Sequence, residues 1–132
     1  MNVVRAYLGV LGITYLVLAI WCAVAPAQTS AAVGFSLTGD SGRSEFLTVY
    51  GGFELGLGLI FLGPLFRPAQ TPFALTACLW LHACLVACRS VSFCLYPQVT
   101  STTVTFAVTE WVIFLSSAAL SWRVATRNAA AA

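Results

Sequence analysis

Four long apolar stretches alternate with short polar segments along the chain. The stretches cover about 3–25, 46–65, 73–95 and 104–122. Each is close to the roughly 20 residues that a helix needs to cross the hydrocarbon core of a bilayer. Pro26, Pro64 and Pro97 lie at or near stretch ends, where a missing amide donor disturbs a helix least. The pattern predicts an all-α integral membrane protein, a four-transmembrane-helix bundle with up-down-up-down topology, in a single membrane domain over residues 1–132.

Six of the ten charged residues lie outside the four stretches. Residues 27–43 form a polar loop rich in Ser, Thr and Gly, long enough for a short helix or a lid. With four spans, one side of the membrane receives Arg5, Arg67, Arg123 and Arg127, and the other receives Arg43 with Asp40 and Glu45. The positive-inside rule therefore predicts two cytoplasmic termini and an extracytoplasmic loop 27–43. The tail 128–132 is expected to be disordered.

The first stretch has an alternative interpretation. Ala25, Pro26 and Ala27 resemble a signal-peptidase site, and Arg5 supplies a minimal positive region before the apolar run. The run is, however, longer than the roughly 7–15 residues of a signal core. Cleavage would leave three spans, with the new N-terminus outside.

Composition points to lipid as the partner of these helices. Hydrophobic residues make up 60% of the chain and charged residues 8%, with a mean hydropathy of +0.92. Soluble domains carry roughly 25% charged residues. The net charge of +2 comes without a lysine and with scattered arginines, so no nucleic-acid surface is expected. The five cysteines form no CxxC pair and are interpreted as small apolar residues, so no metal site is expected and no cofactor is indicated.

Three charged residues lie inside the apolar stretches. These are Glu54, Arg89 and Glu110, in the second, third and fourth stretch. A charged side chain near the centre of a membrane helix costs about 2.5–3.5 kcal/mol. With a helical rise of about 1.5 Å per residue, all three fall roughly 8–15 Å below the outer face. We therefore expect them to converge in the outer half of the bundle.

Helical spacing extends this polar cluster. Gly51, Glu54 and Gly58 share one face, and His82 lies about two turns from Arg89 on another. The residues expected to line a ligand site are Tyr15, Tyr50, Gly51, Glu54, Gly58, His82, Arg89 and Glu110. On an adjoining face, Gly52 and Gly56 form a GxxxG pair that suits a homo-oligomer or another helical partner.

The charge count suggests chemistry at the cluster. Glu54 and Glu110 against Arg89 leave one excess negative charge, so either one carboxyl carries a proton or His82 does. Either state supplies a titratable proton, which makes both glutamates candidates for acid–base catalysis. In the structural alternative, an Arg–Glu pair only fixes the register of the helices and His82 is a core residue.

The stretch EFLTVYGGFELGLGLIFL at 45–62 resembles a family of small bacterial four-span membrane proteins of unknown function, DUF4345, distantly similar to DoxX-type bundles. The resemblance implies a signature made of Glu45, Tyr50, Gly51, Gly52, Glu54 and Gly58. It also implies an arginine late in the third span, matching Arg89, and an acidic residue in the fourth, matching Glu110. A bacterial inner membrane is the expected location. DoxX-type relatives imply links to quinone or sulfur redox chemistry, although no residue of this chain requires it.

The leading functional hypothesis is a binding protein. A small lipophilic molecule, such as a quinone, an isoprenoid or a lipid, is expected to bind in a polar intramembrane pocket in the outer half of the bundle. Two alternatives stay open. One is an intramembrane acid–base isomerase or cyclase, and the other is a structural or assembly subunit of a membrane complex.

Overall fold

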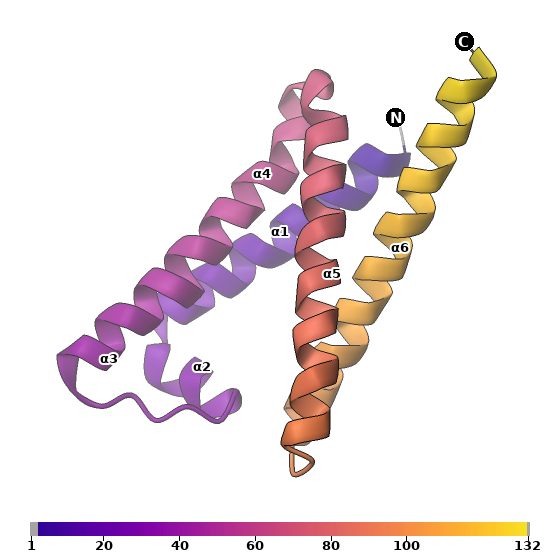
Figure 1. Ribbon diagram of the computed structural model, residues 1–132. Helices are drawn as coiled ribbons and strands as arrows, with labels where there is room; N and C mark the ends of the chain where they lie inside the picture. The colour runs from indigo at the N-terminus through magenta and orange to yellow at the C-terminus, as the bar shows by residue number, and fades with distance from the viewer. Residues whose placement is uncertain (1–2, 132) are drawn as a thin grey trace. The chain divides into compact units, whose positions relative to one another are not determined.

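The chain is helical along almost its whole length in the computed structural model, which describes residues 3–131 (Figure 1). The α-helices are α1 (Val3–Val24), α2 (Pro26–Ala32), α3 (Gly39–Phe46), α4 (Glu54–Phe66), α5 (Thr71–Leu95) and α6 (Ser101–Ala131). A π-helix, η1 (Leu47–Phe53), joins α3 to α4, and a 3₁₀-helix, η2 (Pro68–Gln70), precedes α5. No strand occurs among residues 3–131. The predicted all-α class is confirmed.

Four helical segments are long and apolar enough to cross a membrane. They are Val3–Val24, Gly39–Phe66, Pro68–Leu95 and Ser101–Ala130. Large apolar side chains are exposed along these segments, among them Val10, Val17, Leu59, Trp80 and Val108. Water would solvate such surfaces poorly, whereas lipid solvates them well. The four segments therefore suit an integral membrane protein.

Several helix ends differ from the predicted ones. The second long segment begins at Gly39, inside the predicted loop 27–43, and α2 occupies the first part of that loop. Asp40 in the first turn of α3 suits the positive end of the helix dipole, which favours an early start. At the other end of the chain, α6 continues to Ala131, so the expectation of a disordered tail was wrong for 128–131; Ala132 lies outside the described residues. The alanines there are the strongest helix formers.

The chain divides between Thr71 and Pro72 into two compact units. In the first unit α1 and α4 run antiparallel, side by side (Figure 1). Arg5, near the start of α1, donates from Nε to the carbonyl of Pro64 (2.8 Å) and from Nη2 to that of Leu65 (2.9 Å). The arginine thus supplies donors and a positive charge to the last turn of α4, whose carbonyls lack partners within the helix.

Glycines allow α1 and α4 to approach closely. A Cβ atom on Gly12 would lie 2.9 Å from the backbone nitrogen of Leu62 and 3.0 Å from the carbonyl oxygen of Gly58. A Cβ on Gly58 would lie 3.1 Å from the carbonyl oxygen of Gly12. Small residues permit this backbone-to-backbone packing, which is a common way to join membrane helices. Gly58, which is also predicted to line a ligand site, contacts α1.

The second unit contains α5 and α6, two long antiparallel helices joined by residues 96–100 (Figure 1). The hydroxyl of Thr100 accepts the backbone N–H of Thr103 at 3.3 Å. This hydrogen bond satisfies one of the free donors at the N-terminus of α6. The cap and the short connection direct α6 back along α5.

Candidate intramembrane site

Arg89 and Glu110 form a forked ion pair between α5 and α6. The Nε of Arg89 donates to Oε2 of Glu110 at 2.9 Å, and Nη2 donates to Oε1 at 2.6 Å. Two parallel, charge-assisted hydrogen bonds fix the relative orientation of both groups. The side chains keep 28% and 14% of their surface exposed, respectively, so the pair is not sealed.

The course of the two helices explains why these residues meet. Arg89 lies near the C-terminal end of α5, and Glu110 lies a few turns after the start of α6. Because the helices are antiparallel, the two positions fall at matching heights. Both helices are otherwise strongly apolar, so each charge finds its partner on the neighbouring helix rather than in solvent.

A second polar cluster joins the same two helices. Sγ of Cys78 lies 3.2 Å from Oγ of Ser117 and 3.6 Å from Nδ1 of His82. Nδ1 of His82 donates to the carbonyl oxygen of Cys78 at 2.8 Å, since a carbonyl can only accept. All three side chains are buried. The sequence alone predicts Cys78 to be a small apolar residue, because its contact with Ser117 depends on how α6 lies against α5.

No metal centre is evident in the part of the chain that the structure describes. Within residues 3–131, no three His, Cys, Asp or Glu side chains are gathered closely enough to hold a metal ion. The five cysteines are all free thiols.

Glu54 lies in the first unit, where the π-helix passes into α4. Its Oε2 atom is buried and has no hydrogen-bond partner among the described residues. A buried polar atom without a partner costs roughly 1–3 kcal/mol. The oxygen is thus available to a hydrogen-bonding group that the chain itself does not supply there.

The structure also shows the contacts of the other first-unit residues that were predicted to line a ligand site. The ring of Tyr15 meets that of Phe61 edge-on, with centroids 5.5 Å apart. Tyr50 stacks on Phe46 at a centroid distance of 4.7 Å, and Gly51 is buried within η1. The structure thus joins Arg89 to Glu110 and places His82 on the same helix pair. The convergence of Glu54 with that ion pair stays a prediction.

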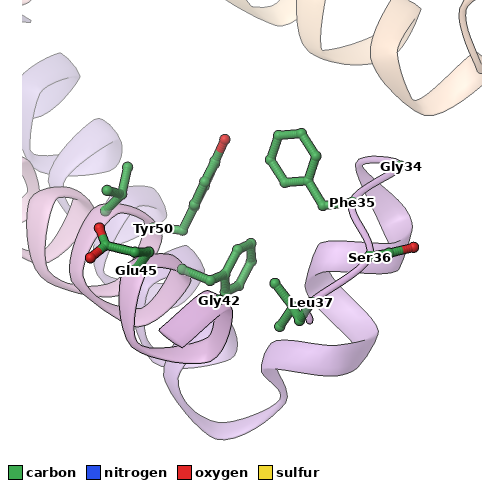
Figure 2. Close-up of a pocket in the computed structure, with 9 residues that line it drawn as sticks. Gly34, Phe35, Ser36, Leu37, Gly42, Glu45 and Tyr50 are labelled. Atoms are coloured by element: carbon green, nitrogen blue, oxygen red, sulfur yellow. The ribbon is translucent and has the colours of Figure 1, made fainter. Parts of the chain in front are cut away.

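The first unit also contains a hollow that the sequence did not predict. It has a volume of about 360 Å³ and lies between η1 and the segment linking α2 to α3 (Figure 2). Its lining includes Phe35, Leu37, Glu45, Phe46, Val49 and Tyr50. Only Tyr50 among these was expected to bind a ligand. One signal was present, because Gly34 followed by an apolar residue is typical of a helix C-terminus that turns back on itself.

Comparison with known proteins identifies the family. The family model described as "Domain of unknown function (DUF4345)" matches residues 3–121. No curated protein and no solved structure matches the chain. The resemblance drawn from residues 45–62 is confirmed by a match that covers most of the sequence. The protein therefore belongs to the DUF4345 family of unknown function.

Proposed function

We propose that this membrane protein binds a small lipophilic molecule whose polar end is received by Arg89 and Glu110. The observation that carries the proposal is a forked ion pair between two apolar helices that stays partly accessible, at 28% of the Arg89 side chain. Charged groups within membrane helices are costly and commonly mark ligand or ion pathways. The guanidinium has five N–H donors, more than the two that Glu110 accepts, and such donors suit a carbonyl, hydroxyl or phosphate oxygen.

We propose Glu54 as a polar contact for a bound molecule in the first unit. Its unpartnered Oε2 supports a role in hydrogen bonding to the bound molecule. Tyr15, Tyr50, Gly51 and His82 are proposed to complete the lining, whereas the contact of Gly58 with α1 favours a packing role for that glycine. A quinone, an isoprenoid or a lipid would supply the required apolar body.

The proposal is tested by identifying what the protein carries out of the membrane. Wild-type protein is extracted directly into lipid nanodiscs, and native mass spectrometry compares its bound molecules with those of Arg89→Gln and Glu54→Gln. Matched controls are Ser90→Ala and Thr109→Val, whose hydroxyls only donate to carbonyls of their own helices. We expect one adduct in wild type and controls that is lost in both variants. No adduct in wild type, or equal adducts in all five proteins, would refute the proposal.

A second candidate is an acid–base isomerase or cyclase, favoured by the unpartnered carboxyl oxygen of Glu54. In this candidate Glu54 or Glu110 moves a proton on the bound molecule. The adduct identified by native mass spectrometry is incubated with protein in liposomes, and its products are followed by chromatography. Conversion that disappears in Glu54→Gln or Glu110→Gln, while binding persists in that variant, supports an enzyme. Unchanged recovery of the molecule refutes it.

We further propose that copies of the chain associate through Gly52 and Gly56, as expected for a homo-oligomer or an assembly subunit. A Cβ added to either glycine would meet nothing within 4 Å, so this face of the first unit is open to another helix. Differently tagged copies should co-purify, and Gly52→Leu with Gly56→Leu should abolish this. Co-purification that survives both substitutions would exclude the GxxxG face.

The four apolar helices are proposed to reside in a bacterial inner membrane, with both termini in the cytoplasm. Support comes from the antiparallel pairing of α1 with α4, which places Arg5 and Arg67 at the same end of the first unit. Arg123 and Arg127 lie together in the last turns of α6. Such clustering is what the positive-inside rule favours on the cytoplasmic face.

A further inference from the structure

Three aromatic side chains, Phe35, Phe46 and Tyr50, pack together in the hollow beside η1, and we call them the aromatic corner. Tyr50 stacks on Phe46 with their planes 20° apart, and Phe35 meets Tyr50 at 66° with centroids 5.7 Å apart. Figure 2 shows the rings of Phe35 and Tyr50 projecting side by side from the segment that follows Gly34 and from η1. Phe35 nevertheless remains 47% exposed, so much of its ring is uncovered.

The backbone holds Phe35 in this position. The N–H of Phe35 donates to the carbonyl of Ser30 at 2.8 Å, and that of Gly34 donates to Ala31 at 3.0 Å. Gly34 has φ +82°. These features form a Schellman motif at the end of α2, in which a glycine with positive φ reverses the chain. The turn therefore fixes the position of a half-exposed phenylalanine ring, which makes the ring a candidate contact for a ligand.

The lining specifies the chemistry of the occupant. Leu37 and Val49 add apolar surface, and no basic side chain lines the hollow, which disfavours an anion. The carboxylate of Glu45 points away from the two rings in Figure 2, so it offers little to a cation in the corner. Aromatic side chains favour offset or edge-on contact with another ring. The hollow is widely open, so a ring would lie against its aromatic wall rather than be enclosed.

We propose that this hollow is a second binding site, selective for a neutral molecule with a flat ring. The ring would rest against the uncovered face of Phe35, with Tyr50 at its edge. This site goes beyond the proposed function: it shares only Tyr50 with the intramembrane site and uses none of Arg89, Glu110 and Glu54, so either proposal can fail alone.

The test compares a ring with a chain of equal carbon number. Protein in lipid nanodiscs is titrated with 1-naphthol and, separately, with 1-decanol, and binding to empty nanodiscs is subtracted. A 4-fluorophenylalanine label at Phe35 reports proximity through its fluorine resonance. We expect saturable binding of 1-naphthol that shifts this resonance, and little competition from 1-decanol. Absence of saturable binding, or equal competition by 1-decanol, would overturn the proposal.

Variants separate the ring contact from general apolar burial. Phe35→Leu keeps an apolar side chain without a ring and should weaken 1-naphthol binding about tenfold, as should Phe35→Ala. Gly34→Ala strains the positive-φ turn and should also weaken binding. Phe53→Ala removes an exposed ring outside the hollow and should change nothing. Equal losses in the Phe35 and Phe53 variants would refute the site.

One further variant separates the two proposals. Arg89→Gln should lose the adduct of the intramembrane site and retain binding of 1-naphthol, since it lies outside the hollow. Loss of 1-naphthol binding in this variant, with the fold intact by circular dichroism, would show that the hollow is not an independent site.

Discussion

Several hydroxyl groups in these helices donate to backbone carbonyls nearby in the chain. Thr14, Ser90, Thr105 and Thr109 each donate to the carbonyl four residues earlier in their own helix. Such bonds hide a polar group from lipid without joining one helix to another. Against this background, the Arg89–Glu110 pair and the Cys78–Ser117 contact stand out because they cross between α5 and α6. Specificity in the second unit therefore depends on few side chains.

Also at the residue scale, alanine substitutions can distinguish a glycine that packs against a neighbouring helix from a glycine that has room for a side chain. Gly12→Ala places a methyl group against the backbone of α4, 2.9 Å from the nitrogen of Leu62, and should lower the free energy of unfolding by about 1–3 kcal/mol. Gly42→Ala, in α3, makes only ordinary van der Waals contact with Leu37, at 3.7 Å, and should be neutral or stabilise by up to about 1 kcal/mol, because alanine favours a helix. Unfolding in SDS mixtures measures the free energy of unfolding of both variants. Equal destabilisation by the two would contradict the packing described.

At the scale of whole elements, the end of α4 depends on a side chain from another helix. Arg5→Gln removes charge-assisted donors from the carbonyls of Pro64 and Leu65 and should cost about 1 kcal/mol. Amide exchange in the last turn of α4 should accelerate. The control is Arg67→Gln, since Arg67 is exposed at the same end of the first unit. This variant should change neither the free energy of unfolding nor the amide exchange. Unchanged exchange in Arg5→Gln would show that the two hydrogen bonds contribute nothing.

The sequence predicts the existence of the four long helices, because a continuous apolar run of this length has few other stable solutions. It predicts their ends less well. The start at Gly39 depends on local polar residues such as Asp40, and the long α6 depends on the helix propensity of its alanines. The π-helix Leu47–Phe53 cannot be predicted from the spacing of apolar residues, because one wider turn shifts that spacing only slightly.

The candidate site was partly predictable for a similar reason. Arg89 and Glu110 could be singled out because a charge in a membrane helix needs a partner, and the antiparallel arrangement of α5 and α6 brings them together. The hollow could not be found in this way. Phe35 and Phe46 look like ordinary apolar residues until the Schellman turn places Phe35 beside Tyr50.

At the scale of the whole molecule, the arginines predict the orientation in the membrane. If Arg5, Arg67, Arg123 and Arg127 lie in the cytoplasm, a green fluorescent protein fused after Ala132 should fluoresce, and alkaline phosphatase fused there should be inactive. A phosphatase inserted in the segment 34–38 should be active. The opposite pattern of activities would invert the topology, and an active phosphatase at both positions would indicate an odd number of spans.

The most direct test exchanges the charges of the ion pair. In the double variant Arg89→Glu with Glu110→Arg, attraction between α5 and α6 is restored, although each single variant should lose about 1–3 kcal/mol of stability. A pair that only fixes helix register should recover both stability and the bound molecule when swapped. We expect instead that the swapped protein regains stability in SDS unfolding but carries no adduct in native mass spectrometry, because the guanidinium no longer faces the ligand from α5. An adduct retained at wild-type level in the swapped protein would contradict the binding role of Arg89.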